Sequence, residues 1–314
     1  MSAGGGGKAV VAALGANLAI AAAKLVGFAV TGSSSMLAEA VHSFADSGNQ
    51  VLLLVGGKRA ARDADERHPF GYGRERYFYS FVVALVLFSL GSLFALFEGL
   101  DKVRHPHHLD SAGVAVAILL FAIVAEAFSF RTAIGEASPL RNGVSWPDYV
   151  RRAKSPELPV VLLEDFAALI GLFLALLGVT LTLVTDDPVW DGVGTLGIGV
   201  LLGFVAIVLA VEMKGLLIGE SASREAVAAI RTALVDGETV LRVIHLKTLH
   251  LGPDELLVAA KVAVAPGLAL PAVARAIDDA EVRVRAAEPL ARQLYLEPDL
   301  DRSPSAVSSL QEGS

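Results

Sequence analysis

The sequence predicts an α-helical membrane protein that ends in a small soluble α+β domain. Of its 314 residues, 54% are hydrophobic and only 19% are charged, whereas soluble domains carry about a quarter charged residues. The apolar residues come in blocks of about twenty, which is the length that a helix needs to cross a bilayer. After Lys214 these blocks stop, and patterns typical of amphipathic helices and strands begin.

Six apolar blocks predict six transmembrane helices. Their approximate bounds are Ala9–Thr31, Met36–Gly57, Tyr77–Gly99, Ser111–Ile134, Leu158–Val184 and Pro188–Lys214. The loops after the second and fourth blocks are rich in Arg and Lys, while the opposite loops are poor in both, so the positive-inside rule predicts cytoplasmic N and C termini. The Ala-, Val- and Gly-rich composition, without the pattern of a transit peptide, favours a bacterial plasma membrane.

Residues 219–300 predict a soluble domain with the element order αββαβ. The expected elements are the helix Ser223–Val235, the strands Val240–Leu249 and Leu256–Ala265, the helix Pro271–Ala287 and the strand Arg292–Leu296. This order predicts helices on one face of a small antiparallel sheet, a ferredoxin-like arrangement. We therefore expect a transmembrane domain at 1–218, a cytoplasmic domain at 219–300 that pairs with its twin in a homodimer, and a disordered polar tail at 301–314.

The second apolar block carries an ionisable pair at a depth where water is scarce. His42 and Asp46 are four residues apart and share one helix face, with Glu39 and Gln50 close to the same stripe. In hydrocarbon such groups cost several kcal/mol unless they are partnered, so they point to function. The alternative is a polar pair that only joins helices, but the spacing and the flanking acid favour a functional site.

The fifth block contains two adjacent acids, Glu164 and Asp165, about two turns from its start. Neighbouring residues on a helix point about 100° apart, so only one of them can face a given ligand squarely. We expect Asp165 to join His42 and Asp46. Glu164 is then an auxiliary ligand, a proton carrier or a partner for an Arg.

Other polar residues leave alternatives open. Lys24 is expected to extend toward the outer interface along its own stem. Asn17 either joins helices or lines a pathway, and Glu126 either pairs with a cation, which is favoured, or relays protons. In the loop after the second block, Asp65 and His68 could form a weak cation site, although a solvated connector is the preferred interpretation.

One imidazole and two or three carboxylates on separate helices suit a divalent cation. Zn²⁺ takes four N or O ligands, and since the chain has no Cys the same set could hold Mn²⁺, Fe²⁺ or Co²⁺. Such ligands bind metal only when deprotonated, so metal and protons compete for the site, as in an antiporter. We expect the cation as substrate, no organic cofactor and, with a net charge of −7, no nucleic-acid partner.

These residues resemble the cation diffusion facilitators, a family of zinc-transporter-like metal/proton antiporters. The similarity lies in the segment GSSSMLAEAVHSFAD at 32–46, the loop HPFGYG at 68–73, the six spans and the αββαβ tail. The resemblance implies a dimer that exports Zn²⁺ or similar ions from the cytoplasm in exchange for protons. It also implies two ligands on each of the second and fifth spans, and on the second span these fall on His42 and Asp46.

The fifth span departs from the family pattern. Many members have His or Asp four residues before the second ligand, but here that place is Val161 and only Asp165 matches. Leu163-Glu164-Asp165 is similar to the branch of the mitochondrial zinc transporters. Three ligands remain unless Glu164, Asn17 or water completes the shell.

Two further metal sites of bacterial relatives are incomplete in this sequence. In the loop, Asp65 and His68 match, but Tyr72 replaces a His. In the tail, Ala260 and Tyr295 stand near the positions of zinc-binding His residues. We therefore expect a tail that supports dimerisation without a tight metal cluster.

Two other function classes stay open. Asp46 and Asp165 could serve an intramembrane metal-dependent enzyme as an acid/base pair or by activating water. Alternatively, the missing ligand on the fifth span allows a metal-binding assembly protein that transports nothing. No nucleophile or hydrolase motif accompanies the carboxylates, so the sequence predicts a transporter rather than an enzyme.

Overall fold

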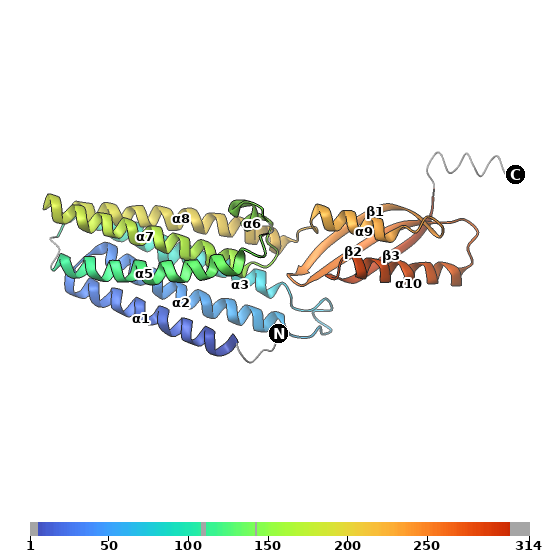
Figure 1. The fold of residues 1–314 in the computed structure, drawn as a ribbon, viewed down its shortest axis with the longest axis horizontal. Coiled ribbons are helices and arrows are strands. Elements are labelled where there is room, and N and C mark those ends of the chain that lie inside the picture. The colour runs from blue at the N-terminus through green and yellow to red at the C-terminus, as the bar shows by residue number, and fades with distance from the viewer. Residues whose placement is uncertain (1–5, 108–110, 142, 302–314) are drawn as a thin grey trace. The chain divides into compact units, whose positions relative to one another are not determined.

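The computed structural model describes residues 6–107, 111–141 and 143–301, which form two compact units (Figure 1). One unit contains the chain up to Ala61 together with Glu75–Lys214, and the other contains Arg62–Arg74 and the chain from Gly215. The sequence instead predicts a single boundary after residue 218, with the whole chain before it in the transmembrane domain. The loop belongs to the second unit because Gly73 packs on the β-hairpin there, where a Cβ would lie only 2.9 Å from the carbonyl oxygen of Leu251.

The first unit is built from helices. Their bounds are α1 Gly6–Thr31, α2 Ser34–Ala60, α3 Glu75–Val86, the π-helix η1 Leu87–Leu93, α4 Phe94–Arg104, α5 Ala112–Ala137, α6 Trp146–Arg152, α7 Glu157–Thr185 and α8 Val189–Ile218. Four helical stretches in the described part of the chain are long and apolar enough to cross a membrane: Glu75–Arg104, Gly113–Ala137, Glu157–Thr185 and Val189–Ile218. The helical membrane class is thus confirmed, while α2 has the length of a span but carries a polar stripe.

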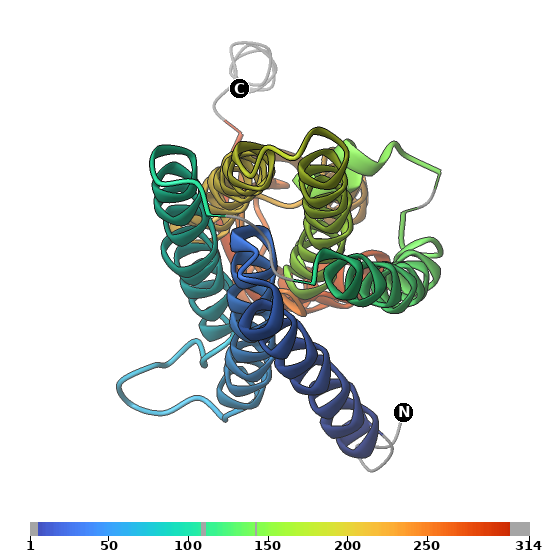
Figure 2. The ribbon, with the colours of Figure 1, turned by 90° about the vertical axis from the view of Figure 1, so that its left-hand side faces the viewer.

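Helix α2 lies at the centre of this unit. It packs against α1, α3, η1, α4 and α7, and α5 packs along α7. Figure 2, which views these helices nearly end-on, shows α1 beside α2 and α5 beside α7. The polar stripe of α2 is therefore enclosed by neighbouring helices, as the cost of burying unpaired polar groups in hydrocarbon requires.

The start of α2 is fixed by a carboxylate from α8. Asp191 is fully buried and accepts hydrogen bonds from the hydroxyl of Ser33 at 2.8 Å and from the backbone N–H of Ser34 at 2.7 Å. These donors belong to the N-cap and first turn of α2, where a negative charge is favoured by the unpaired N–H groups and the helix dipole. Asp191 therefore links α2 to α8.

A buried ion pair joins α1 to α2. The Lys24 ammonium donates hydrogen bonds to Glu39 Oε2 at 2.9 Å and to Ser43 Oγ at 2.7 Å, and both Lys24 and Glu39 are fully buried. The expectation that Lys24 extends toward the interface is wrong. The ammonium instead pairs with a buried carboxylate, which compensates part of the cost of removing both charges from water.

The second unit contains two helices and a three-stranded sheet. Their bounds are α9 Arg224–Leu234, β1 Val240–Gly252, β2 Glu255–Val264, α10 Leu270–Ala287 and β3 Ala291–Leu300. The predicted element order is confirmed, but the fully antiparallel sheet is wrong, since β3 pairs parallel to β2. The chain crosses back through α10 before β3 begins, and such a crossover returns it in the same direction.

One face of this sheet packs on both helices. Buried residues alternate along β2, with Leu256, Val258 and Val262 on the inner face, and they share one apolar core with Ile230 of α9 and Val284 of α10. The predicted tail at 301–314 begins with Asp301, whose carboxylate pairs with Arg242 of β1. The rest of that tail lies outside the described residues.

A single carboxylate orders the turn between α9 and β1. Asp236 Oδ1 accepts hydrogen bonds from the backbone N–H groups of Glu238, Thr239 and Val240 at 2.8–2.9 Å. Burial acts to raise the pKa of Asp236, but these bonds and one from the Thr239 hydroxyl outweigh it and lower the pKa well below the usual value.

Removing the Lys24 ammonium should destabilise the protein strongly. Lys24→Met leaves Glu39 buried without its counter-charge, which costs about 3–5 kcal/mol, whereas replacing both partners by apolar residues is close to neutral. We expect the double variant Lys24→Met/Glu39→Met to unfold closer to the wild-type temperature than Lys24→Met alone, measured by thermal unfolding in detergent. Equal melting of the single variant and the wild type would contradict this.

Asp236→Ala should lower the free energy of unfolding by about 1–3 kcal/mol at neutral pH, because several donors lose a charged acceptor. A carboxyl group with a depressed folded-state pKa contributes stability above its unfolded pKa, and that contribution disappears as pH falls through the folded value. The difference from wild type should thus shrink below about pH 4. Hydrogen exchange of the β1 amides at neutral pH and thermal melts at lower pH test this, with the exposed Asp279→Ala as the control.

Candidate metal centre

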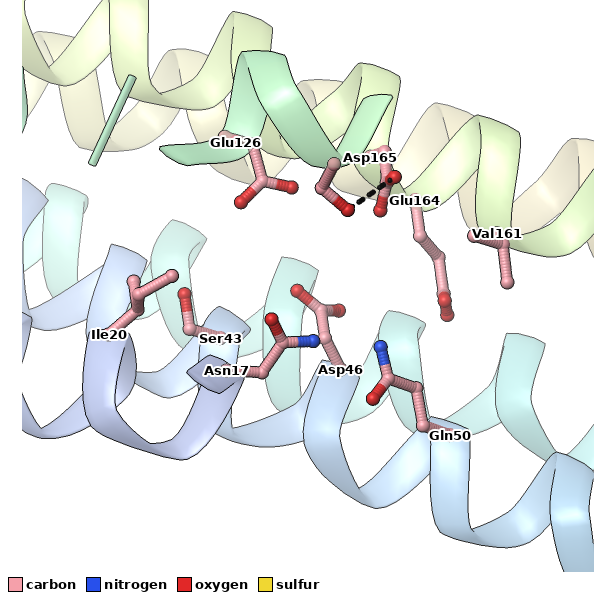
Figure 3. Close-up of a pocket in the computed structure, with 10 residues that line it drawn as sticks. Asn17, Ile20, Ser43, Asp46, Gln50, Glu126, Val161, Glu164 and Asp165 are labelled. Atoms are coloured by element: carbon pink, nitrogen blue, oxygen red, sulfur yellow. Dashed lines mark hydrogen bonds between the residues drawn. The ribbon is translucent and has the colours of Figure 1, made fainter. Parts of the chain in front are cut away.

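Four helices of the first unit enclose a small polar cavity (Figure 3). Its lining residues are Asn17 and Ile20 of α1, Ser43, Asp46 and Gln50 of α2, Glu126 and Ser129 of α5, and Val161, Glu164 and Asp165 of α7. The volume of about 20 Å³ is room for one water-sized particle. Four carboxyl groups thus surround a space the size of a single ion or water within apolar helices.

Two of the predicted ligands share this cavity. Asp46 projects from α2 and Asp165 from α7, and Figure 3 shows their carboxyl groups on facing walls. Asp165 Oδ2 accepts a hydrogen bond from Ser129 Oγ of α5 at 3.0 Å. Asp46 Oδ1 is buried and has no hydrogen-bond partner among the described residues. The α2 carboxylate therefore keeps a lone pair available for a cation.

His42 lies next to Asp46 but is not part of the cavity wall. Its Nδ1 is 3.5 Å from Asp46 Oδ1, the ring is fully buried, and neither nitrogen forms a hydrogen bond within the described chain. The opposite neighbour is the π-helix η1, where a Cβ on Gly91 would lie 3.9 Å from Nδ1. His42 can thus support Asp46, while a shared ion with Asp165 requires a side-chain rotation.

In the arrangement shown, the predicted ligands do not form a closed coordination shell. No three His, Asp or Glu side chains of the described residues lie close enough together to hold a metal ion as they stand. Asp46 and Asp165 are brought to one cavity, and His42 is brought to Asp46 alone. The assignment of these three residues as a joint metal site stays a prediction.

Glu164 has a partner that sequence reasoning missed. It is 5% exposed, and its Oε1 accepts a hydrogen bond from Asn49 Nδ2 of α2 at 2.7 Å. Asn49 lies seven residues after His42, which places both on the same face of α2, and this periodicity could have identified it. Of the three alternatives for Glu164, pairing with an Arg is not found among the described residues, and the amide of Asn49 is the partner instead.

Helix α5 contributes two cavity residues. Glu126 lines the cavity without a hydrogen bond or ion pair to any described residue, so the favoured pairing of Glu126 with a cation is wrong. Ser129, one turn later on the same face, was missed although the three-residue spacing from Glu126 is visible in the sequence. Asn17 also lines the cavity, which favours the pathway alternative for this residue.

A second cavity of about 200 Å³ adjoins the first. It shares Ser129, Val161 and Asp165 with the small cavity and extends to Glu136 of α5 and Glu157 at the start of α7. Glu157 is also paired with Arg76 at the start of α3. This cavity thus connects Asp165 with the end of the helices that adjoins the basic loops, along a path with further carboxylates.

The predicted loop site has its carboxylate engaged by the loop itself. Asp65 accepts hydrogen bonds from the Tyr72 hydroxyl at 2.6 Å and the backbone N–H of His68 at 2.7 Å, and these bonds lower the pKa of Asp65 below its usual value. The His68 Nδ1 lies 3.4 Å from Asp65 Oδ1. Tyr72 thus takes the place of a third ligand, and the pair stabilises the loop turn.

The tail positions are unsuited to metal binding. Ala260 is buried in the core of the second unit and Tyr295 is exposed, with its ring edge-on to Phe70 at 6.5 Å between centroids. Neither side chain is a ligand for a divalent cation. The absence of a tight metal cluster from the tail stays a prediction.

Comparison with known proteins identifies the family. A model of the cation efflux transmembrane domain matches residues 10–218. The proton-coupled zinc antiporter SLC30A9, mitochondrial, of Xenopus laevis is 36% identical over 243 residues, which are 77% of this chain and 43% of that protein. Metal tolerance protein C4 of Arabidopsis thaliana is 29% identical over 248 residues, 78% of this chain and 54% of that protein.

A bacterial relative shows the same relationship at lower identity. The magnetosome protein MamB of Magnetospira sp. (strain QH-2) is 25% identical over 229 residues, 72% of each chain. The chain spans about half or less of the length of the Xenopus and Arabidopsis relatives. Since the family model covers well over half of this sequence, the protein belongs to the cation efflux family.

Proposed function

We propose that this protein exports a divalent metal cation across a membrane in exchange for protons. One observation carries the proposal, namely that Asp46 and Asp165 face each other across a cavity enclosed by apolar helices. Buried carboxylates are costly unless a cation or a proton neutralises them. The names of the relatives, which include a zinc antiporter and a metal tolerance protein, support a metal as that cation.

Metal and protons would alternate in the same cavity. A divalent cation bound by Asp46 and Asp165 compensates two negative charges, and two protons do the same once the metal has left. His42, at 3.5 Å from Asp46, is the nitrogen donor nearest to this pair and makes zinc the first candidate. Manganese, iron and cobalt are also compatible with a set rich in carboxylates.

The larger cavity supports access from the cytoplasmic side. It runs from Asp165 toward Glu157, at the helix ends that adjoin the Arg- and Lys-rich loops, and such loops are retained in the cytoplasm. On this basis we propose six crossings, α1 and α2 included, with N and C termini in the cytoplasm. The composition favours a bacterial plasma membrane, whereas the names of the SLC30A9 relatives place those proteins in mitochondria.

The second unit is proposed to join two copies of the chain. Its three-stranded sheet leaves β1 and β3 as edge strands, and the unpaired backbone groups of an edge strand can pair with a second copy of the chain. We retain the bounds 1–218 for transport and 219–300 for a ferredoxin-like dimerisation domain. A homodimer in detergent, measured by light scattering, is the expected state.

Neutralising either aspartate should abolish transport. Asp46→Asn and Asp165→Asn each remove a charged ligand, so we expect at least a hundredfold loss of cation uptake into proteoliposomes with an imposed pH gradient. Zn²⁺, Mn²⁺, Fe²⁺ and Co²⁺ should be compared in the same assay, and His42→Ala should reduce the uptake of Zn²⁺ most. The exposed Asp186→Asn, in the turn between α7 and α8, is the matched control.

Uptake by both aspartate variants at the wild-type rate would overturn the proposed function. Wild-type protein that binds metal but moves none would instead favour an assembly protein that does not transport.

A further inference from the structure

We propose that Glu126 of α5 supplies the metal ligand that is missing at Val161 of α7, an inference that rests on the proposed transport function. The site would then take one carboxylate from each of three helices, with His42 as the nitrogen donor beside Asp46.

The position on α7 one turn before Asp165 holds a residue that cannot bind a metal. Val161 lines the wall one turn before Asp165, and its isopropyl group offers no lone pair. Zn²⁺ and related ions take four or more ligands, and Asp46, Asp165 and His42 make three. A fourth ligand is therefore required, either water or another side chain that lines the cavity.

Glu126 is better placed for this role than Glu164. The Glu164 carboxylate is held by Asn49 at 2.7 Å, and turning it toward an ion would break that bond. Glu126 accepts no hydrogen bond from the described residues, so it can turn without losing one. Figure 3 shows its carboxyl group on the same side of the cavity as that of Asp165 and across from Asp46.

A second observation comes from α2. His42 is fully buried with both ring nitrogens unpaired in the described chain, and the adjacent Asp46 Oδ1 is buried and unpaired as well. Unsatisfied polar atoms are rare in buried positions, and a bound ion is one partner that would satisfy them. Lys24, the nearby cation, is already engaged by Glu39 and Ser43.

The charges around Asp46 point the same way. Asp46, Glu126, Glu164 and Asp165 all line the same small cavity, so their carboxyl groups repel one another whenever they are ionised together. Like charges at this separation repel strongly where water is excluded. A divalent ion bound by Glu126 as well as by the two aspartates would relieve this repulsion at the point where it is largest.

Helix α5 also positions the neighbouring ligand. Ser129, three residues after Glu126, donates a hydrogen bond to Asp165 Oδ2 at 3.0 Å, and α5 packs along α7. Glu126 and Asp165 would therefore approach an ion as one unit. Ser129 is a positioning residue, since it acts through Asp165 rather than on the ion.

This ligand set has a consequence for selectivity. Three carboxylates and one imidazole accept Mn²⁺ and Fe²⁺ more readily than a set with two imidazoles, which favours Zn²⁺. Exchanging Glu126 for His should hence keep a donor in place but shift the preference toward zinc. A residue that only fills space would not change the preference for one metal over another.

The test is equilibrium metal binding by the purified full-length protein in detergent, measured with Zn²⁺ and Mn²⁺ by titration calorimetry. Glu126→Gln should weaken the binding of both ions at least tenfold. Glu126→His should retain Zn²⁺ binding within about threefold and lose Mn²⁺ binding by tenfold or more. Glu98→Gln, an acid of α4 that lines neither cavity, is the matched control and should bind as wild type does.

Two results would overturn the ligand assignment. One is wild-type affinity of Glu126→Gln for both metals, and the other is an unchanged ratio of Zn²⁺ to Mn²⁺ affinity in Glu126→His. Thermal unfolding establishes whether each variant is folded. If Glu126→Gln does not fold, the ratio of Zn²⁺ to Mn²⁺ affinity in Glu126→His tests the ligand assignment. If the wild-type protein binds metal but vesicles take up none, the transport function is refuted and the ligand assignment is not, because the binding assay still reports on Glu126.

Discussion

The structure depends on negative charge that the helices themselves do not neutralise. Asp46, Glu126, Glu164 and Asp165 surround one small cavity, whereas the buried ammonium of Lys24 is paired with Glu39. In an apolar medium, carboxylates at such separations stay ionised only beside a cation. This requirement explains why donor atoms on α2 are left without partners, and it makes an occupant of the cavity a condition of the ionised state.

Polar contacts hold α2 in place along its length, while Asp46 and Glu126 have no hydrogen-bond partner among the described residues. Asp191 binds its first turn, Glu39 pairs with Lys24 of α1, and Asn49 donates to Glu164 of α7. Glu39 lies close to the stripe of His42 and Asp46, and Asn49 lies on the same helix face as His42, but each of these contacts fixes a helix. The polar residues of α2 are therefore of two kinds: those with a partner in the protein fix the helix, and those without one are available to a ligand.

The sequence predicts the elements better than their pairings. Block length and charge bias indicate the helices, and the order αββαβ indicates the second unit, because these features are local. The partner of Lys24, the parallel direction of β3 and the entry of Glu126 into the cavity depend on which helices or strands become neighbours. Spacing along one helix finds His42 and Asp46, but the approach of α5 to α7 is set by packing, which no single-helix pattern reveals.

The position of Glu126 also shows how a site can persist after one ligand is lost. Val161 removes a donor from α7, yet α5 packs along that helix and brings an acid to the same cavity, with Ser129 holding Asp165. An ion bound by Asp46, Glu126 and Asp165 would join α2 to the pair of α5 and α7, whereas the empty site leaves their carboxylates to repel one another. In the proposed mechanism, occupancy would therefore act on the distance between these helices, and a change in that distance would allow access from alternate sides.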